Sequence, residues 1–173
     1  MFTFDKDNKA FQNVIFKDED WKPNNNPLID FLNNAGIDII HVESFFTHRN
    51  HYGALHTDYS WLSNHTKLNI SRGGKDSGIE WYTSTNLVNL PPIPPNKEQK
   101  LQDHILTANM KTCTKIGSAN THKASLCNVG QLHRTYNHSD EDRHTLCFVL
   151  IYKDTETVLD FNDAIKMLKE YIA

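Results

Sequence analysis

His56 and Asp58 are the two residues of this sequence whose types and spacing most directly suggest chemistry. Side chains at positions i and i+2 of an extended segment lie on one face, so this imidazole and carboxylate would point the same way. A histidine far downstream, His133, could complete a set of two histidines and one carboxylate. Such a set holds non-haem Fe(II) and leaves coordination positions open. Arg143, ten residues after His133, would add a fixed cation for a carboxylate-bearing ligand. Together these residues indicate an oxygenase.

Arg143 and Thr145 would lie on the same face of a final strand, so a guanidinium and a hydroxyl could share one carboxylate. If the strands of His133 and Arg143 pair as a hairpin through the turn between them, the metal ligand and the carboxylate anchor would face one cavity. The competing interpretation of Arg143 is a surface salt bridge with Glu141 or Asp142.

Hydrophobic periodicity predicts the elements that position these residues. A helix is expected from Asn26, its cap, to Gly36, and a second over residues 161–172, with an apolar stripe made of Ala164, Ile165, Leu168 and Ile172. Strands are expected over residues 37–42, 67–70, 79–83, 112–116, 124–129, 132–137 and 143–152. The run 146–152 suits a central strand buried on both faces, with Cys147 in the sheet interior. This order indicates an α+β fold around a sandwich or barrel, with residues 1–173 as one domain.

Two further segments are candidates for the mouth of such a barrel. Residues 90–96 contain too many prolines for an interior strand. We expect a rigid crossover there, and the alternative is a lid over the mouth. Tyr59 and Trp61 are candidate substrate contacts, and the alternative for both is ordinary packing.

Three motifs together resemble the Fe(II)/2-oxoglutarate-dependent oxygenase superfamily: His56-Thr57-Asp58, then residues 132–137 around His133, then Arg143-His144-Thr145. The resemblance implies a double-stranded β-helix (jelly-roll, cupin-like) core with flanking N- and C-terminal helices. It also implies that His56, Asp58 and His133 bind Fe(II) as the catalytic centre, while Arg143 and Thr145 hold the distal carboxylate of 2-oxoglutarate. Lys67 and Asn69, on one face of the strand after the first ligands, are secondary candidates for cosubstrate binding.

The activity implied is hydroxylation of an unidentified small-molecule or macromolecular substrate, with succinate and carbon dioxide as co-products. Two other classes stay open. A metallohydrolase could use the same three ligands with another metal and an activated water. A non-catalytic jelly-roll binding or virion-associated module would carry the histidines incidentally. The compact size and the Asn- and Lys-rich sequence resemble the small oxygenase-like proteins of tailed bacteriophages.

Composition sets broader bounds on the function. The formal net charge of -3 gives no electrostatic reason to expect nucleic-acid binding. No apolar run reaches membrane-spanning length, and the N-terminus has no secretory signal pattern. The three cysteines, Cys113, Cys127 and Cys147, lack close-pair spacing, which argues against a disulfide framework. A cytoplasmic protein is expected, in the host cytoplasm if it is viral. Ten histidines also mean that a histidine by itself indicates little here.

Overall fold

Two antiparallel sheets form the body of the structure, a computed structural model that describes residues 11–16, 18–22, 26–58, 64–89 and 106–172. The strands are β1 (Phe11–Ile15), β2 (Ile37–Thr47), β3 (His51–Tyr52), β4 (Thr66–Arg72), β5 (Ser77–Ser84), β6 (Leu87–Asn89), β7 (Leu106–Ala108), β8 (Cys113–Asn120), β9 (Ser125–Asn128), β10 (His133–Asn137) and β11 (Arg143–Tyr152). The helices are α1 (Asp18–Trp21), α2 (Pro27–Asn34) and α3 (Phe161–Met167), with 3-10 turns η1 (Met110–Thr112) and η2 (Lys169–Tyr171). Every strand expected from the sequence overlaps an observed one.

The strand order defines the fold class. One sheet has five strands in the order β1-β2-β11-β4-β9, a second has four in the order β3-β10-β5-β8, and β6 pairs with β7. Strands β3, β5, β8 and β10 lie in one sheet and β2, β4, β9 and β11 in the other, so the chain changes sheet at each step from β2 to β5 and from β8 to β11. This alternation winds the chain into a double-stranded β-helix, or jelly-roll. The fold class predicted from the sequence is therefore confirmed.

The hypothesis that the strands of His133 and Arg143 form a hairpin is wrong. Strand β10 lies between β3 and β5, whereas β11 lies between β2 and β4 in the other sheet. The turn between β10 and β11 therefore crosses from sheet to sheet. The amide of Asn137, which is fully buried, donates hydrogen bonds there to the carbonyls of Thr47, His48 and Glu141. The two strands still face one interior, but from opposite walls.

Two glycines bring the turn between β4 and β5 close to Arg143. Gly73 and Gly74 have φ values of +76° and +57°, a region that residues with a Cβ rarely adopt. A Cβ at Gly73 would collide with the carbonyl oxygen of Asp142, and one at Gly74 would lie 3.0 Å from the Cβ of Arg143. Residues without side chains are therefore needed where this turn passes the start of β11.

Strand β11 is the central strand that its apolar run predicted. It pairs with β2 and β4 along most of its length, and Val149 and Leu150, which point to opposite faces, are both fully buried. Cys147 is buried on the inner face, as expected. Leu146, at the start of the predicted run, is 38% exposed instead.

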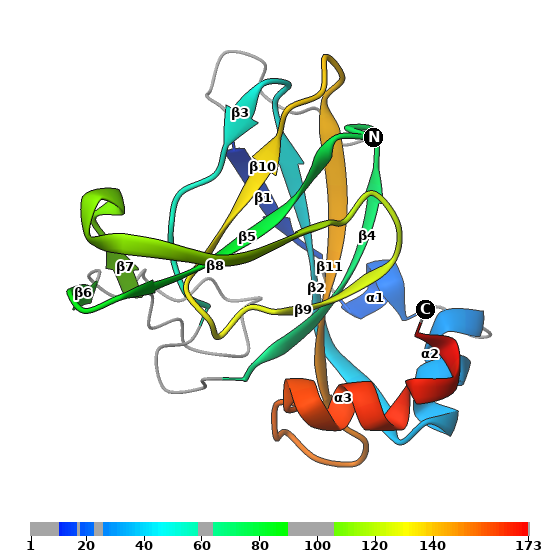
Figure 1. Cartoon of the computed structure of the whole chain (residues 1–173). Coiled ribbons are helices and arrows are strands. Elements are labelled where there is room, and N and C mark those ends of the chain that lie inside the picture. Colours follow the sequence, from blue (N-terminus) through cyan, green and yellow to red (C-terminus); the bar gives the residue numbers. More distant parts are fainter. Residues whose placement is uncertain (1–10, 17, 23–25, 59–63, 90–105, 173) are drawn as a thin grey trace.

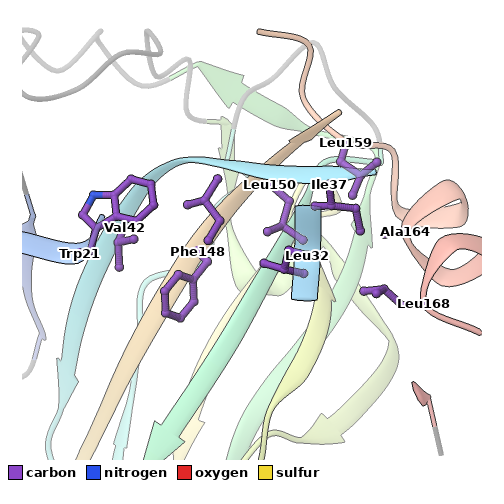
Figure 2. Close-up of a cluster of buried hydrophobic side chains, with 10 residues drawn as sticks. Trp21, Leu32, Ile37, Val42, Phe148, Leu150, Leu159, Ala164 and Leu168 are labelled. Atoms are coloured by element: carbon purple, nitrogen blue, oxygen red, sulfur yellow. The ribbon is translucent and has the colours of Figure 1, made fainter. Parts of the chain in front are cut away.

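The outer face of β2 and β11 packs against the helices, which gather on one side of the molecule (Figure 1). Figure 2 shows this apolar core, to which each helix contributes. Its buried members are Trp21, Leu32, Ile37, Ile39, Val42, Phe148, Leu150, Leu159, Ala164 and Leu168. The helices therefore stabilise the sheet from outside and leave its inner face to the cavity.

The first predicted helix is confirmed and the second is shorter than expected. Asn26 caps α2 by accepting a hydrogen bond from the backbone N–H of Leu28 at 3.1 Å, and Gly36, with φ +79°, follows the helix. Helix α3 ends at Met167 rather than continuing to residue 172. The predicted apolar stripe is also buried only in part. Ala164 and Leu168 are buried, but Ile165 is 38% and Ile172 46% exposed. In the described ranges, no helix has the length and apolar character needed to cross a membrane.

Candidate metal centre

His56, Asp58 and His133 converge on one point. One ligand atom from each lies within 4.8 Å of the others, so the three residues form a group that could hold a metal ion. The Nε2 atom of His56 lies 3.2 Å from Oδ1 of Asp58, and the rings of His56 and His133 are 4.6 Å apart between centroids. Two imidazole nitrogens and one carboxylate oxygen suit first-row divalent metals such as iron, manganese and zinc.

Backbone hydrogen bonds place these ligands. His56 and His133 form an antiparallel bridge in which each N–H donates to the other carbonyl, at 2.9 and 2.8 Å. The backbone N–H of Asp58 donates to the carbonyl of Val129 at 2.8 Å. Between the two ligands, Thr57 is buried and forms a bridge with Leu106. The segment is thus extended, and the i, i+2 geometry predicted for His56 and Asp58 is present.

Each histidine ring is also oriented by a carbonyl group. Nδ1 of His56 lies 2.8 Å from the carbonyl oxygen of Ala54, and Nδ1 of His133 lies 2.8 Å from that of Gln131. A carbonyl only accepts, so each Nδ1 carries a proton, which leaves Nε2 as the atom of each ring that a metal could bind. This second contact fixes the tautomer that a metal requires.

The charge states of the ligands suit a cation. Burial alone would raise the pKa of Asp58, but the Lys67 ammonium and the hydrogen bond with His56 bring that pKa well below its usual range. Burial, helped by nearby His56, lowers the pKa of His133 to about 4, so this ring is neutral. For His56, burial lowers the pKa, but Asp58 outweighs it and the net pKa is raised. A metal at this ring would therefore have to compete with the proton that Asp58 favours.

Arg143 lies in the same cavity and is only 2% exposed. Its Nη2 donates to the hydroxyls of Ser71 at 3.0 Å and Thr121 at 2.7 Å, and its Nε approaches Ser71 at 3.3 Å. Ser71 in turn lies 3.0 Å from the hydroxyl of Thr145. The interpretation of Arg143 as a surface salt-bridge residue is therefore wrong. In the described part of the chain its partners are neutral, and no carboxylate pairs with it.

The secondary candidates Lys67 and Asn69 also line the cavity. The Lys67 ammonium contacts two carboxylates, Glu43 and Asp58, each at 2.7 Å. Asn69 donates to the thiol of Cys127 at 3.5 Å, and its buried Oδ1 has no hydrogen-bond partner among the residues that the structure describes. A 180° rotation of this amide would present Nδ2 to the cavity instead.

The cavity itself has a volume of about 50 Å³ and lies between the two sheets. This is room for roughly three to five water molecules, the scale of a small organic acid. Its lining also includes residues that the motifs did not identify, namely Phe45, Thr47, Ile79, Val129, Thr135 and Cys147. Ser71, a partner of Arg143, follows Asn69 by two residues, so the alternation of the strand places it on the same face as Lys67 and Asn69. No pattern in the sequence points to Thr121, the other partner of Arg143. Tyr59, Trp61 and residues 90–96, the candidate mouth segments, lie outside the described residues.

The known proteins to which this chain is similar are found among solved structures. No protein-family model and no curated protein matches the sequence. Among solved structures, the chain is similar to vicilin from hazelnut (Corylus avellana), with 12% identity and a TM-score of 0.39 over 82% of this chain and 30% of that one. It is similar to Bacillus subtilis oxalate decarboxylase, which has Mn(II) centres, with 10% identity and a TM-score of 0.38 over 93% of this chain and 30% of the other.

An oxalate oxidase is similar at 9% identity and a TM-score of 0.39, over 92% of this chain and 66% of that one. The chain thus spans about a third of the vicilin and decarboxylase chains. Metal-dependent and enzymatic proteins occur among these neighbours. At such low scores the likeness carries no argument about activity, and the jelly-roll assignment follows from the strand order.

Proposed function

We propose that this protein is a non-haem Fe(II)- and 2-oxoglutarate-dependent dioxygenase that hydroxylates an unidentified substrate. The observation that carries the proposal is Arg143, a buried cation without a carboxylate partner among the described residues, in the same cavity as His56, Asp58 and His133. A ligand that chelates a metal at one end and presents a carboxylate at the other would satisfy both features.

The contrast between the two cations of the cavity favours an anion at Arg143. Lys67 is neutralised by Glu43 and Asp58. Arg143 has hydroxyl partners, and burial lowers its pKa. A buried charge is costly unless it is paired. Because Nη1 makes no hydrogen bond within the described ranges, the guanidinium keeps donors for a bidentate carboxylate. Thr145, through Ser71, adds a hydroxyl beside it.

The donor set fits iron and the proposed cosubstrate. Three protein ligands leave three positions of an octahedral ion for a chelating oxoacid and for dioxygen. When bound, iron and 2-oxoglutarate supply the oxidising chemistry that hydroxylates a C–H bond, with succinate and carbon dioxide as co-products. The protein holds His56 and His133 by their Nδ1 protons, keeps Asp58 ionised, and anchors the distal carboxylate at Arg143. Apolar lining from Phe45, Ile79 and Val129 limits the water near these groups.

The direct test is an anaerobic calorimetric titration with Fe(II) and 2-oxoglutarate. One equivalent of 2-oxoglutarate should bind tightly only after Fe(II) is present, because the metal supplies half of its contacts. Succinate, which keeps the distal carboxylate but lacks the chelating oxoacid, should bind more weakly. Equal 2-oxoglutarate affinity with and without metal would contradict the proposal. Hydrolysis of an ester or phosphate panel by zinc-loaded protein, without 2-oxoglutarate binding, would favour a metallohydrolase. Absence of any metal binding would favour a non-catalytic jelly-roll module.

A further inference from the structure

A line of buried charged groups runs from the metal ligand Asp58 into the interior. Oδ2 of Asp58 lies 2.7 Å from the ammonium of Lys67, which lies 2.7 Å from Oε2 of Glu43. The other oxygen of Glu43, Oε1, lies 3.3 Å from Nε2 of His41. The relative exposures of His41, Glu43 and Lys67 are 1, 4 and 4%. None of these three belongs to the group that could hold a metal.

The two oxygens of Asp58 have different partners. Oδ1 lies 3.2 Å from Nε2 of His56, a second member of the candidate ligand group. Oδ2 forms an ion pair with the ammonium of Lys67. An ionised carboxylate can bind a metal through one oxygen or through both. A cation held at Oδ2 makes binding through both oxygens unfavourable, because the metal would have to displace a hydrogen-bonded ammonium.

Lys67 is fixed in this position by the sheet and by Glu43. In β4 it is paired with Val149 of β11 and Cys127 of β9. Burial alone would raise the pKa of Glu43, but Lys67 and the hydrogen bond with His41 outweigh this effect. The net pKa of Glu43 is lowered, so its carboxylate is ionised. A buried lysine is tolerated when it is paired, and Glu43 is a second carboxylate for it. Lys67 can thus contact Asp58 without removing the ligand's whole negative charge.

We propose that Lys67, held by Glu43, is a positioning residue that reserves Oδ2 of Asp58 and so restricts this ligand to coordination through Oδ1. The inference rests on the proposed metal site and deepens it. Coordination through one oxygen leaves three positions of an octahedral ion open, whereas coordination through two leaves two. A chelating oxoacid and dioxygen together need three open coordination positions. Lys67 would therefore keep enough positions open for both ligands to bind.

The number of water molecules on bound Mn(II) tests this directly. Mn(II) added without 2-oxoglutarate reports its own hydration through the relaxation of water protons. Wild-type protein should retain three waters on Mn(II). The double variant Lys67→Met with Glu43→Gln removes the cation without leaving an unpaired buried carboxylate. Its relaxation enhancement per bound Mn(II) should fall to about two thirds of the wild-type value, since Asp58 then takes a second position. Lys67→Arg, which retains the cation, should keep the wild-type value.

A matched control is Lys115→Met, which removes a lysine–glutamate contact of 2.6 Å, to Glu80 outside the cavity. It should retain three waters. The single variant Glu43→Gln is the second probe. It tests the same inference if the double variant does not fold. Lys67 then has Asp58 as its remaining described carboxylate partner and competes with the metal, so Mn(II) affinity should fall by about tenfold or more with the hydration unchanged.

Equal hydration of wild type and the double variant at equal Mn(II) occupancy would overturn the inference, as would unchanged Mn(II) affinity in Glu43→Gln. The outcome is separable from the proposed oxygenase function. A wild-type protein that shows the predicted hydration but does not bind 2-oxoglutarate would contradict the function and leave the role of Lys67 intact. A wild-type protein that binds no Mn(II) would overturn both.

Discussion

His56 and His133 are hydrogen bonded to each other through their backbones, N–H to carbonyl in both directions, at 2.9 and 2.8 Å. This pairing brings two imidazoles from distant parts of the sequence to a centroid separation of 4.6 Å. Because the bridge belongs to the backbone, the separation of the two ligands is set by the fold. The candidate metal site should therefore be formed before any metal arrives.

Replacing one ligand should abolish metal binding while the fold persists. His133→Ala, Asp58→Ala and His56→Ala each leave two ligands, and we expect the Fe(II) or Zn(II) affinity to fall by more than about 100-fold. Calorimetric titration would measure the affinity, and circular dichroism would check the fold. His144→Ala, on an exposed position of β11, is the matched control and should bind metal as wild type does. Metal binding of wild-type strength in all three ligand variants would exclude this site.

Arg143→Ala should weaken 2-oxoglutarate binding by at least about 30-fold, or about 2 kcal/mol, because the partner of a desolvated carboxylate is lost. Fe(II) affinity should stay nearly unchanged. Arg143→Lys should recover part of the affinity, since an ammonium supplies the charge but not the bidentate geometry. Arg134→Ala, which removes an arginine paired with Glu80, is the control. Equal 2-oxoglutarate affinity in wild type and Arg143→Ala would assign this arginine a structural role only.

Asn137→Ala should destabilise the protein by about 2–4 kcal/mol. The side chain is fully buried, donates to three carbonyls, and accepts from the N–H of Ser139, and each lost partner leaves a polar group unsatisfied. Asn120, whose side-chain hydrogen bonds are exposed, provides the control, and Asn120→Ala should cost less than about 1 kcal/mol. Urea unfolding would measure both values. Equal effects would contradict the assigned role of Asn137 at the crossing between the sheets.

Glu80 should make the stability depend on pH in the acid range. Burial raises the pKa of Glu80, but hydrogen bonds from Lys115, Tyr82 and Arg134 lower it to about 2, from an ordinary value of 4.5. The stabilisation is therefore present above pH 4.5 and is lost as the pH falls toward 2. Glu80→Gln should lower the free energy of unfolding by about 1.5–3 kcal/mol at pH 7. This difference should shrink steadily below pH 4.5. A difference that stays constant between pH 7 and pH 3 would contradict the assignment.

Local periodicity explains what could be predicted from the sequence. A period of two places His56 with Asp58, and Arg143 with Thr145, on common faces, and these placements need only an extended backbone. Helix caps predicted α2 for a similar reason, because the interactions at Asn26 are local. These features depend on neighbours within a few residues.

The rest depends on contacts between distant segments. Periodicity assigns a side chain to a face but does not name the partner strand. The hypothesis of a hairpin between β10 and β11 fits the periodicity, although the two strands lie in different sheets. The stripe predicted for the last helix names four residues, but Ile165 and Ile172 are exposed, because only the fold decides which of them meet a core. The contacts of Lys67 with Glu43, and of Arg143 with Thr121, join strands or loops whose proximity only the fold creates.

The most direct test of the central claim is the formation of succinate from 2-oxoglutarate. Protein incubated with Fe(II), oxygen and 2-oxoglutarate should produce succinate slowly, and removal of any one of the three should stop it. Asp58→Ala, which lacks a metal ligand, and zinc-loaded protein, which has no redox chemistry, should produce none. No succinate from Fe(II)-loaded wild-type protein across a broad substrate panel, or equal succinate from Asp58→Ala, would contradict the proposed function.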